Sequence, residues 1–247
     1  YLPDSLSSIS SYMFTWSQKL KYVKLPSAID SIPDNTFFYC SSLSNIELPQ
    51  TVTSIGVQAF AYCQSLISIV IPGGLDKIAD TAFEECYNLS KVLNNSNLQL
   101  TIGSKDNGQI AYWAKIIIDK NGNKTYKEGT SDCEYIETAD GFLFERENEK
   151  YTLTAYFGNK DAVTLPLNIN GEAYVIYQMK GVKNVIIPKD FQKIDDSAFR
   201  SCDSLISVTS ESSSLLTSVA YGAFLGCSSL DRKSTRLNSS HPSRSRM

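Results

Sequence analysis

Residues 48–72 read LPQTVTSIGVQAFAYCQSLISIVIP, and this stretch decides the fold of the 247-residue chain. Its opening Leu-Pro pair is followed 23 residues later by the pair Ile71-Pro72. The same pair stands at Leu2-Pro3 and at Leu25-Pro26, again 23 residues apart. A sequence period between about 20 and 50 residues is typical of a solenoid, in which successive units stack as coils.

The 23-residue spacing also holds for apolar residues at five other positions, four times each within residues 1–93. The pattern lapses after Leu93, returns at Val163, passes through a shortened unit and ends with a unit two residues longer. The five columns are Leu6, Ile29, Val52 and Leu75; Ile9, Ile32, Ile55 and Ile78; Phe14, Phe37, Phe60 and Phe83; Leu20, Leu43, Leu66 and Leu89; and Val23, Ile46, Ile69 and Val92.

One unit shows how such a coil is built. Ile46 and Leu48 alternate with polar residues, which predicts a short strand with one buried face. Pro49 ends this strand because it cannot donate a hydrogen bond to the next one. Phe60 and Leu66 then fill the interior. One coil cannot bury these side chains alone, so we expect coils to stack at about 4.8 Å and form a parallel sheet.

Residues 59–66 and 198–205 both read Ala-Phe-x-x-Cys-x-x-Leu, followed by alternating apolar positions. In this the chain resembles the BspA-like class of leucine-rich repeats. The resemblance implies a mainly β repeat solenoid of 23-residue units in a cell-surface or secreted protein that acts in adhesion or partner binding. Two departures stand out. Ser17 replaces the usual Cys in the first unit, and the unit over 166–188 lacks Ala-Phe and Cys, so we expect an irregular coil there.

These patterns predict four segments. Repeats occupy residues 1–93, a β-rich insertion follows at 94–162, and further repeats occupy 163–230. The insertion contains two expected hairpins. One joins residues 115–119 to 124–126 across Asn121-Gly122, and the other joins 141–145 to 151–156.

Residues 231–247 form the fourth segment. Its first eleven residues resemble the translation of a common sequencing adapter, since GAT-CGG-AAG-AGC encodes Asp-Arg-Lys-Ser. We therefore expect a non-native tail on a truncated run of repeats; the alternative is a native basic tail. The tail carries five of the 23 basic and one of the 26 acidic residues, which leaves 18 against 25.

The resulting net charge of about −7 disfavours nucleic acid and anionic membranes as partners, because both attract clustered Lys and Arg. No run of apolar residues is long enough to span a membrane. The chain begins at Tyr1, and no signal peptide is visible in it. A surface or secreted location is therefore implied by the family resemblance alone.

Catalytic and metal chemistry have few candidates. The one histidine, His241, lies in the suspected tail. Carboxylate neighbours such as Glu84-Glu85, Asp195-Asp196 and Glu145 with Glu147 are interpreted as solvated surface. Residues 119–123 resemble the start of a calcium loop but lack its Gly and Glu, so a hairpin turn is favoured. We expect no catalytic residue, no cofactor and no metal site.

The cysteines recur at one repeat position. Metal ligands come as close pairs, and a disulfide prefers about 3.8 Å between Cβ atoms, which is less than the coil spacing. We therefore expect a column of buried thiols that act as small apolar side chains. This column contains Cys40, Cys63, Cys86, Cys202 and Cys227, while Cys133 lies in the insertion. The Phe column is likewise predicted to be core.

What remains for function is the outward side of the stacked strands. Solenoids present such a face to partners. Apolar and polar residues mix on it, which is consistent with a recognition strip or, equally, with the β-propensity of a sheet that the insertion covers. The candidate partner-binding residues are Tyr22, Lys24, Asn45, Glu47, Ser68, Val70, Lys91, Leu93, Asn184, Ile186, Ser207 and Thr209.

Three functions follow. The leading hypothesis is a surface-exposed or secreted protein-binding or adhesion module with a protein or glycoprotein partner. The second is a structural spacer that displays another domain of a larger surface protein. The third, an enzyme with its site in 94–162, has the least support, since nothing in that segment matches a catalytic motif.

Overall fold

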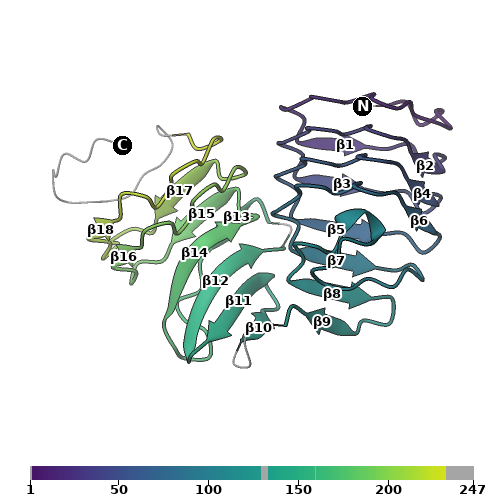
Figure 1. The fold of residues 1–247 in the computed structure, drawn as a ribbon. Coiled ribbons are helices and arrows are strands. Elements are labelled where there is room, and N and C mark those ends of the chain that lie inside the picture. Colours follow the sequence, from purple (N-terminus) through teal and green to yellow (C-terminus); the bar gives the residue numbers. More distant parts are fainter. Residues whose placement is uncertain (1, 129–132, 159, 232–247) are drawn as a thin grey trace. The chain divides into compact units, whose positions relative to one another are not determined.

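The computed structural model describes residues 2–128, 133–158 and 160–231. The chain forms two compact units, Tyr1–Lys127 and Glu128–Met247 (Figure 1). Short strands dominate both units, and one 3-10 turn, η1 (Asn107–Gln109), is present among the described residues. The predicted repeat solenoid is confirmed. The segment 231–247 lies outside the described residues except for Asp231.

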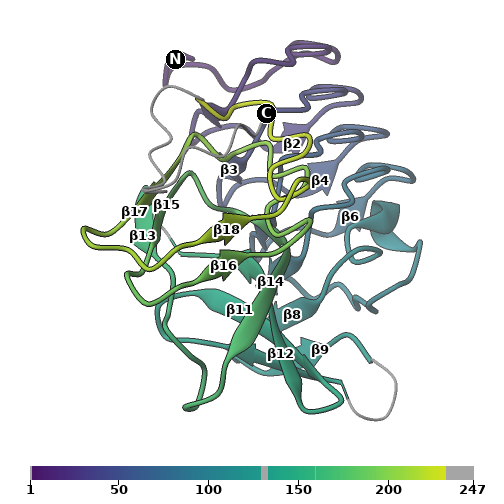
Figure 2. The ribbon, with the colours of Figure 1, turned by 90° about the vertical axis from the view of Figure 1, so that its left-hand side faces the viewer.

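Unit 1 has two walls of strands. One strand per coil forms the first wall, in which the strands run parallel, coil upon coil. These strands are β1 (Tyr22–Lys24), β3 (Asn45–Glu47), β5 (Ser68–Ile71), β7 (Lys91–Asn94) and β8 (Ile116–Asp119). The second wall is the parallel set β2 (Ser31–Ile32), β4 (Ser54–Ile55) and β6 (Lys77–Ile78) (Figure 2).

The alternation in the sequence explains which side chains are buried. In β3, Ile46 is 3% exposed while Asn45 and Glu47 face outward. The second wall contributes Ile32 and Ile55, both about 1% exposed. The apolar columns of the two walls therefore enclose one core that runs along unit 1.

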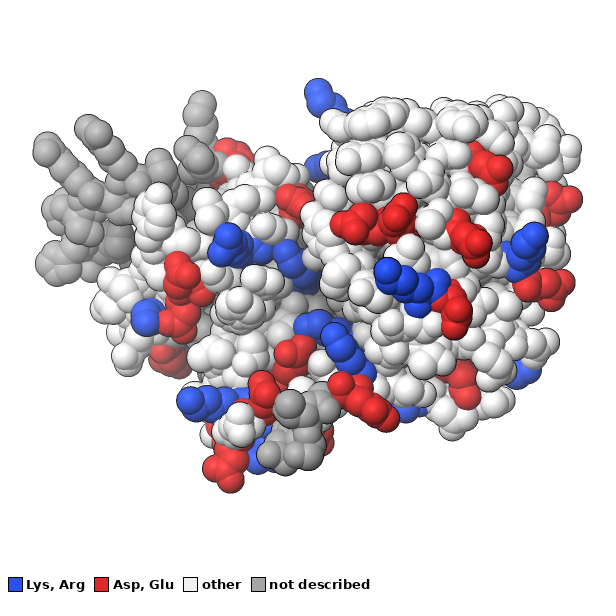
Figure 3. Space-filling view, in the orientation of Figure 1, with Lys and Arg blue, Asp and Glu red and all other residues white. Residues whose placement is uncertain are grey.

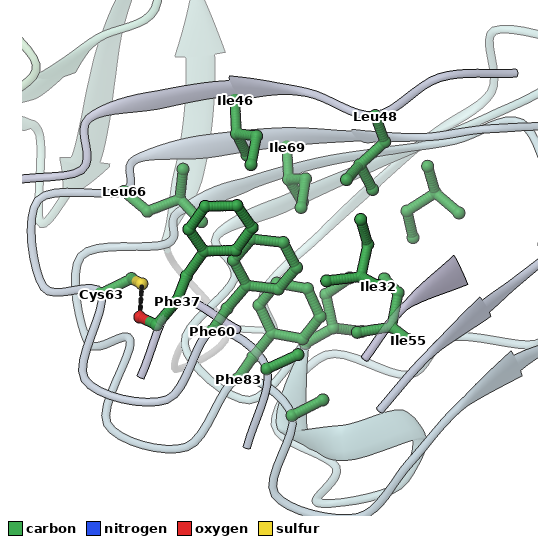
Figure 4. Packing of buried hydrophobic residues seen from close by; sticks show 14 of the residues in the cluster. Ile32, Phe37, Ile46, Leu48, Ile55, Phe60, Cys63, Leu66, Ile69 and Phe83 are labelled. Atoms are coloured by element: carbon green, nitrogen blue, oxygen red, sulfur yellow. Dashed lines mark hydrogen bonds between the residues drawn. The ribbon is translucent and has the colours of Figure 1, made fainter. Parts of the chain in front are cut away.

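The Phe column packs through this core. Phe14, Phe37, Phe60 and Phe83 stack in order, with ring centroids 5.2, 5.2 and 5.1 Å apart. Figure 4 shows the last three rings in one row. Each pair is worth about 0.5–1.5 kcal/mol beyond the apolar area it buries. The prediction that this column is core is confirmed for Phe37, Phe60 and Phe83, while Phe14 is half-buried.

The cysteine column lies beside the Phe rings. Each thiol of this column in unit 1 donates a hydrogen bond to a Phe carbonyl of the preceding coil, as Cys63 Sγ does to Phe37 O at 3.3 Å (Figure 4). Burial raises the pKa of Cys40 to about 11 and that of Cys86 to about 12. The predicted burial is confirmed for four of the five column members, while Cys227 is half-buried.

The segment 94–162, predicted as one insertion, is divided between the units. The first predicted hairpin is confirmed, since β8 pairs antiparallel with β9 (Lys124–Tyr126). However, β8 also pairs in parallel with β7, with Lys91 opposite Ile116. Residues 94–127 thus continue the solenoid of unit 1, because an aliphatic run such as Ile116-Ile117-Ile118 can bury both faces of a strand.

The described residues of unit 2 form three sheets. The second predicted hairpin is confirmed by the antiparallel pairing of β11 with β12. The first sheet has the order β10 (Glu134–Glu137), β11 (Phe142–Glu147), β12 (Lys150–Tyr156) and β14 (Tyr174–Lys180); the second has β13 (Ala162–Thr164), β15 (Asn184–Ile187) and β17 (Ser207–Ser210); and the third pairs β16 (Lys193–Ile194) with β18 (Ser218–Val219).

The coil over 166–188 is irregular, as its sequence predicts. Where the regular units have a tight turn, it has the seven-residue strand β14, which pairs in parallel with β12. Tyr174 takes the interior place of the missing Phe, with its ring centroid 5.1 Å from Phe144 and 5.9 Å from Phe191. The regular packing resumes with Phe199 and Phe224, whose rings stack at 5.4 Å.

Candidate interaction surface

The outward residues of the first wall form two columns in unit 1. The pairing places Tyr22 beside Asn45 and Lys24 beside Glu47. In the next pair of strands it places Ser68 beside Lys91, and Val70 beside Leu93. Side chains of one column therefore follow each other at about 4.8 Å. We call this set of eight residues the strand face of unit 1.

The strand face changes character along the stack. Tyr22, Lys24 and Glu47 are exposed in the first two coils. Val70, 42% exposed, and the half-buried Leu93 make the later coils apolar, and Ile118 extends their column. Ile118 belongs to the predicted insertion, so the repeat pattern alone does not identify it. This arrangement provides an aromatic ring, a pair of opposite charges and an aliphatic strip on the five strands of the first wall.

The four candidates in unit 2 form a second set, on β15 and β17. Asn184 pairs with Ser207, and Ile186 with Thr209. Ser207 Oγ donates to Asn184 Oδ1 at 2.7 Å, and Asn184 Nδ2 donates to Asp161 O at 2.9 Å. These polar groups therefore already satisfy one another, and this set is less available to a partner than the strand face of unit 1.

Charged side chains do not gather by sign on the side of the molecule that Figure 3 shows. Of the carboxylate neighbours, Asp195 Oδ1 lies 2.7 Å from Lys193 Nζ. Over the described ranges, no cluster of His, Cys, Asp and Glu could hold a metal ion. Nor does any helix in these ranges reach the length and apolar character of a membrane span.

Asp119 terminates β8. Its carboxylate accepts hydrogen bonds from the backbone N–H of Asn121 at 2.8 Å and of Asn123 at 2.9 Å, and from Asn123 Nδ2 at 2.8 Å. These bonds lower the pKa of Asp119, with the Asn123 side chain contributing most. The oxygens that resemble a calcium loop thus organise the hairpin turn, as favoured from the sequence. A shallow polar depression of about 320 Å³ adjoins this turn.

A second feature of unit 1 was missed by the sequence interpretation. Trp16, Tyr39 and Tyr62 are stacked on the turn side, with ring centroids 4.2 and 4.3 Å apart. Phe38 lies roughly perpendicular to all three, at 6.1, 5.2 and 5.7 Å. We call these four residues the aromatic ladder. The repeat period carries the signal for this column, because Trp16, Tyr39 and Tyr62 are 23 residues apart.

The backbone under the aromatic ladder is left-handed, with φ of 62° at Trp16, 58° at Tyr39 and 61° at Tyr62. Bulky residues at positive φ cost about 1–2 kcal/mol each. A unit 2 coil has Gly226, φ 78°, at the equivalent position. The two ring stacks return about 0.5–1.5 kcal/mol each. Together with the three edge contacts of Phe38, the ring contacts therefore offset a cost of this size.

The coils, the continuous core and the outward strand columns together define a leucine-rich-repeat solenoid. Six copies of the BspA type leucine rich repeat region match the chain over residues 1–105 and 163–241. Since this match covers most of the chain, the protein belongs to the BspA-type leucine-rich-repeat family. The matched range extends into residues 231–247, the segment predicted as a non-native tail.

Three solved structures are similar to the chain. A leucine-rich repeat protein from Bacteroides ovatus is 22% identical, with a TM-score of 0.37; the match covers 93% of this chain and 64% of that protein. A leucine rich cell surface protein from Faecalibacterium prausnitzii is 20% identical, with coverages of 93% and 76% and a TM-score of 0.35. A leucine-rich repeat protein from Eubacterium ventriosum is 16% identical, with coverages of 90% and 76% and a TM-score of 0.32. No curated protein matches.

Proposed function

We propose that this chain is the binding or adhesion module of a surface-exposed or secreted protein, and that the strand face of unit 1 takes a protein or glycoprotein partner. The observation that carries the proposal is the outward set of eight residues, held in register within two strand pairs, β1 with β3 and β5 with β7. Family membership supports the surface location. In this proposal the repeats of 1–93 and 163–230 are the scaffold, and the function is not enzymatic.

The composition of the strand face supports a protein partner. Interfaces combine aromatic and aliphatic groups at their centre with charged groups at the rim. Here Val70 and Leu93 provide the aliphatic part, and Tyr22 an exposed ring. The ion pair between Lys24 Nζ and Asp4 Oδ1 is long, at 3.9 Å, and exposed, so Lys24 can exchange it for a partner carboxylate at little cost.

The alternative is a spacer that displays another domain. The observation in its favour is the face of unit 2, where Ser207, Asn184 and Asp161 bond to one another. A face whose polar groups are already satisfied is expected of a scaffold. The two functions differ in what the strand face of unit 1 contributes, and substitution there separates them.

The test is the triple variant Tyr22→Ala, Lys24→Ala and Glu47→Ala. Binding to a panel of immobilised extracellular-matrix proteins and mucin glycoproteins is measured by interferometry. We expect the triple variant to weaken binding about tenfold or more, since an anchor residue contributes at least ~1.4 kcal/mol. The melting temperature should stay unchanged, because the three side chains are exposed.

The matched control is Asp76→Ala with Lys77→Ala, two exposed residues at the second wall. This control should bind as the unaltered protein does. Equal binding by the triple variant and the unaltered protein would remove the strand face of unit 1 as the site and favour the spacer.

A further inference from the structure

The aromatic ladder continues into an acidic pair one coil further on. Trp16, Tyr39 and Tyr62 occupy one column of the 23-residue repeat, and the next member of that column is Glu85. In the neighbouring column of the repeat, Glu84 follows Phe38 after two 23-residue units. A backbone hydrogen bond holds the acidic coil next to the coil of Tyr62, because Tyr62 N–H donates to Glu84 O at 2.8 Å. Aromatic edges and two carboxylates therefore form one stripe on the turn side of unit 1.

Among the described residues, neither Glu84 nor Glu85 forms an ion pair with Lys or Arg. Glu84 Oε2 accepts one long hydrogen bond, 3.3 Å, from Gln58 Nε2. Both charges act on the neighbouring ring, since desolvation, Glu84 and Glu85 all raise the pKa of Tyr62. The stripe thus combines apolar surface with uncompensated negative charge.

The geometry of the rings restricts the partner further. The ring faces between Trp16, Tyr39 and Tyr62 are closed at 4.2 and 4.3 Å, so a partner meets ring edges there and the exposed ring of Trp16, 57% exposed. Nucleic acids and acidic glycans would be repelled by the carboxylates. What the stripe can offer is ring edges, exposed aromatic area and two negative charges.

We propose that the aromatic ladder, together with Glu84 and Glu85, is a docking surface for a basic protein segment. Lys or Arg side chains of that segment pair with the two carboxylates, while its apolar groups pack on Phe38 and Tyr39. This surface is separate from the strand face, since its residues come from the turn side of each coil.

The test uses the fluorescence of Trp16, one of two tryptophans in the chain. A Trp113→Phe background removes the other. The probe is a soluble twelve-residue peptide of Arg alternating with Leu and Gly, compared with the same peptide carrying Glu for Arg. We expect a saturable change of Trp16 emission with the Arg peptide only, weakening as salt rises because the charges are exposed.

Two sets of variants locate the binding. Glu84→Gln with Glu85→Gln removes the charges and leaves the rings, and should weaken binding about tenfold. Tyr39→Asn with Tyr62→Asn removes two rings from a backbone that Asn tolerates, and should abolish binding, with circular dichroism as the check that the variant is folded. The charge-matched control is Asp30→Asn with Asp76→Asn, which removes two exposed acids elsewhere in unit 1 and should leave binding unchanged.

Several outcomes would overturn the proposal. Equal weakening by the control pair would mean that only net charge matters. Binding that survives in the Asn variants would make the aromatic ladder structural, and a response to a neutral oligosaccharide instead of the Arg peptide would assign a glycan. If the Asn variants unfold, the Gln variants still test the proposal, because they remove the two charges and leave the rings in place. None of these changes touches the strand face, so the two proposals fail independently.

Discussion

At the scale of single residues, Gly56 shows how closely one coil approaches the next. A Cβ on Gly56 would clash with the carboxylate of Asp34 and would lie 2.6 Å from Asp34 N and 2.8 Å from Pro33 C. The carboxylate cannot simply move away, because Asp34 Oδ1 accepts a hydrogen bond from Val57 N–H at 2.7 Å. In unit 2, Gly222 also lies against a carboxylate, since its N–H donates to Asp196 Oδ1 at 3.0 Å, but an added Cβ there would meet only the Asp196 side chain.

We therefore predict that Gly56→Ala lowers the free energy of unfolding by about 1–3 kcal/mol, the usual cost of overpacking. Gly74→Ala is the control, since its added Cβ would meet only Gln50 O at 3.8 Å, an ordinary contact. Urea denaturation monitored by circular dichroism measures both variants. A Gly56→Ala protein as stable as Gly74→Ala would show that the coils adjust at this point.

At the scale of structural elements, the thiol column makes stability depend on pH. Burial is the main cause of the raised pKa values of Cys40, Cys86 and Cys202, about 11, 12 and 11. Below about pH 9 these thiols are protonated in the folded and the unfolded chain, so they add no pH dependence. Above it, the unfolded chain loses protons that the folded chain keeps.

The free energy of unfolding should therefore fall from about pH 9 upward, until the folded thiols also ionise near pH 11–12. Each thiol contributes a slope of about 1.4 kcal/mol per pH unit within its own interval. Denaturation curves at pH 8, 9 and 10 measure this slope. Cys86→Ala should make it shallower, whereas an unaltered slope in that variant would assign the pH dependence to other groups.

The sequence predicts some elements much better than others. Where the repeat columns recur, the sequence predicts both the coil and its outward residues, as it does for Tyr22 and Glu47. The parallel pairing of β8 with β7 was not predictable, because the coil between them lacks the Phe and Cys of the repeat. The aromatic ladder was missed for a different reason, since propensity assigns Gly or Asn to left-handed positions and Tyr62 breaks that rule.

At the scale of the whole molecule, each unit has a core of its own. The cluster of unit 1 runs from Ile9 to Ile117, and that of unit 2 from Phe142 to Ala223. Separate cores can unfold in separate steps. We predict two heat-absorption transitions for the full chain in scanning calorimetry.

Two matched substitutions assign these transitions. Phe60→Ala and Phe199→Ala each remove a ring that is 0% exposed and stacked on a neighbour, so each should cost about 3–5 kcal/mol. Phe60→Ala should lower only the transition of unit 1, and Phe199→Ala only that of unit 2. A single transition that both variants shift equally would mean that the units unfold as one.

The equivalence of the coils also has a genetic consequence. In the regular part of unit 1, a coil meets its neighbours through the same columns at the same spacing, as the Phe stack at 5.1–5.2 Å shows. After an in-frame duplication or loss of the DNA that encodes one coil, neighbouring coils would still meet through the same kinds of contact as before. Recombination can thus lengthen or shorten the solenoid by whole coils, and point mutation can then diversify the outward residues of each coil separately.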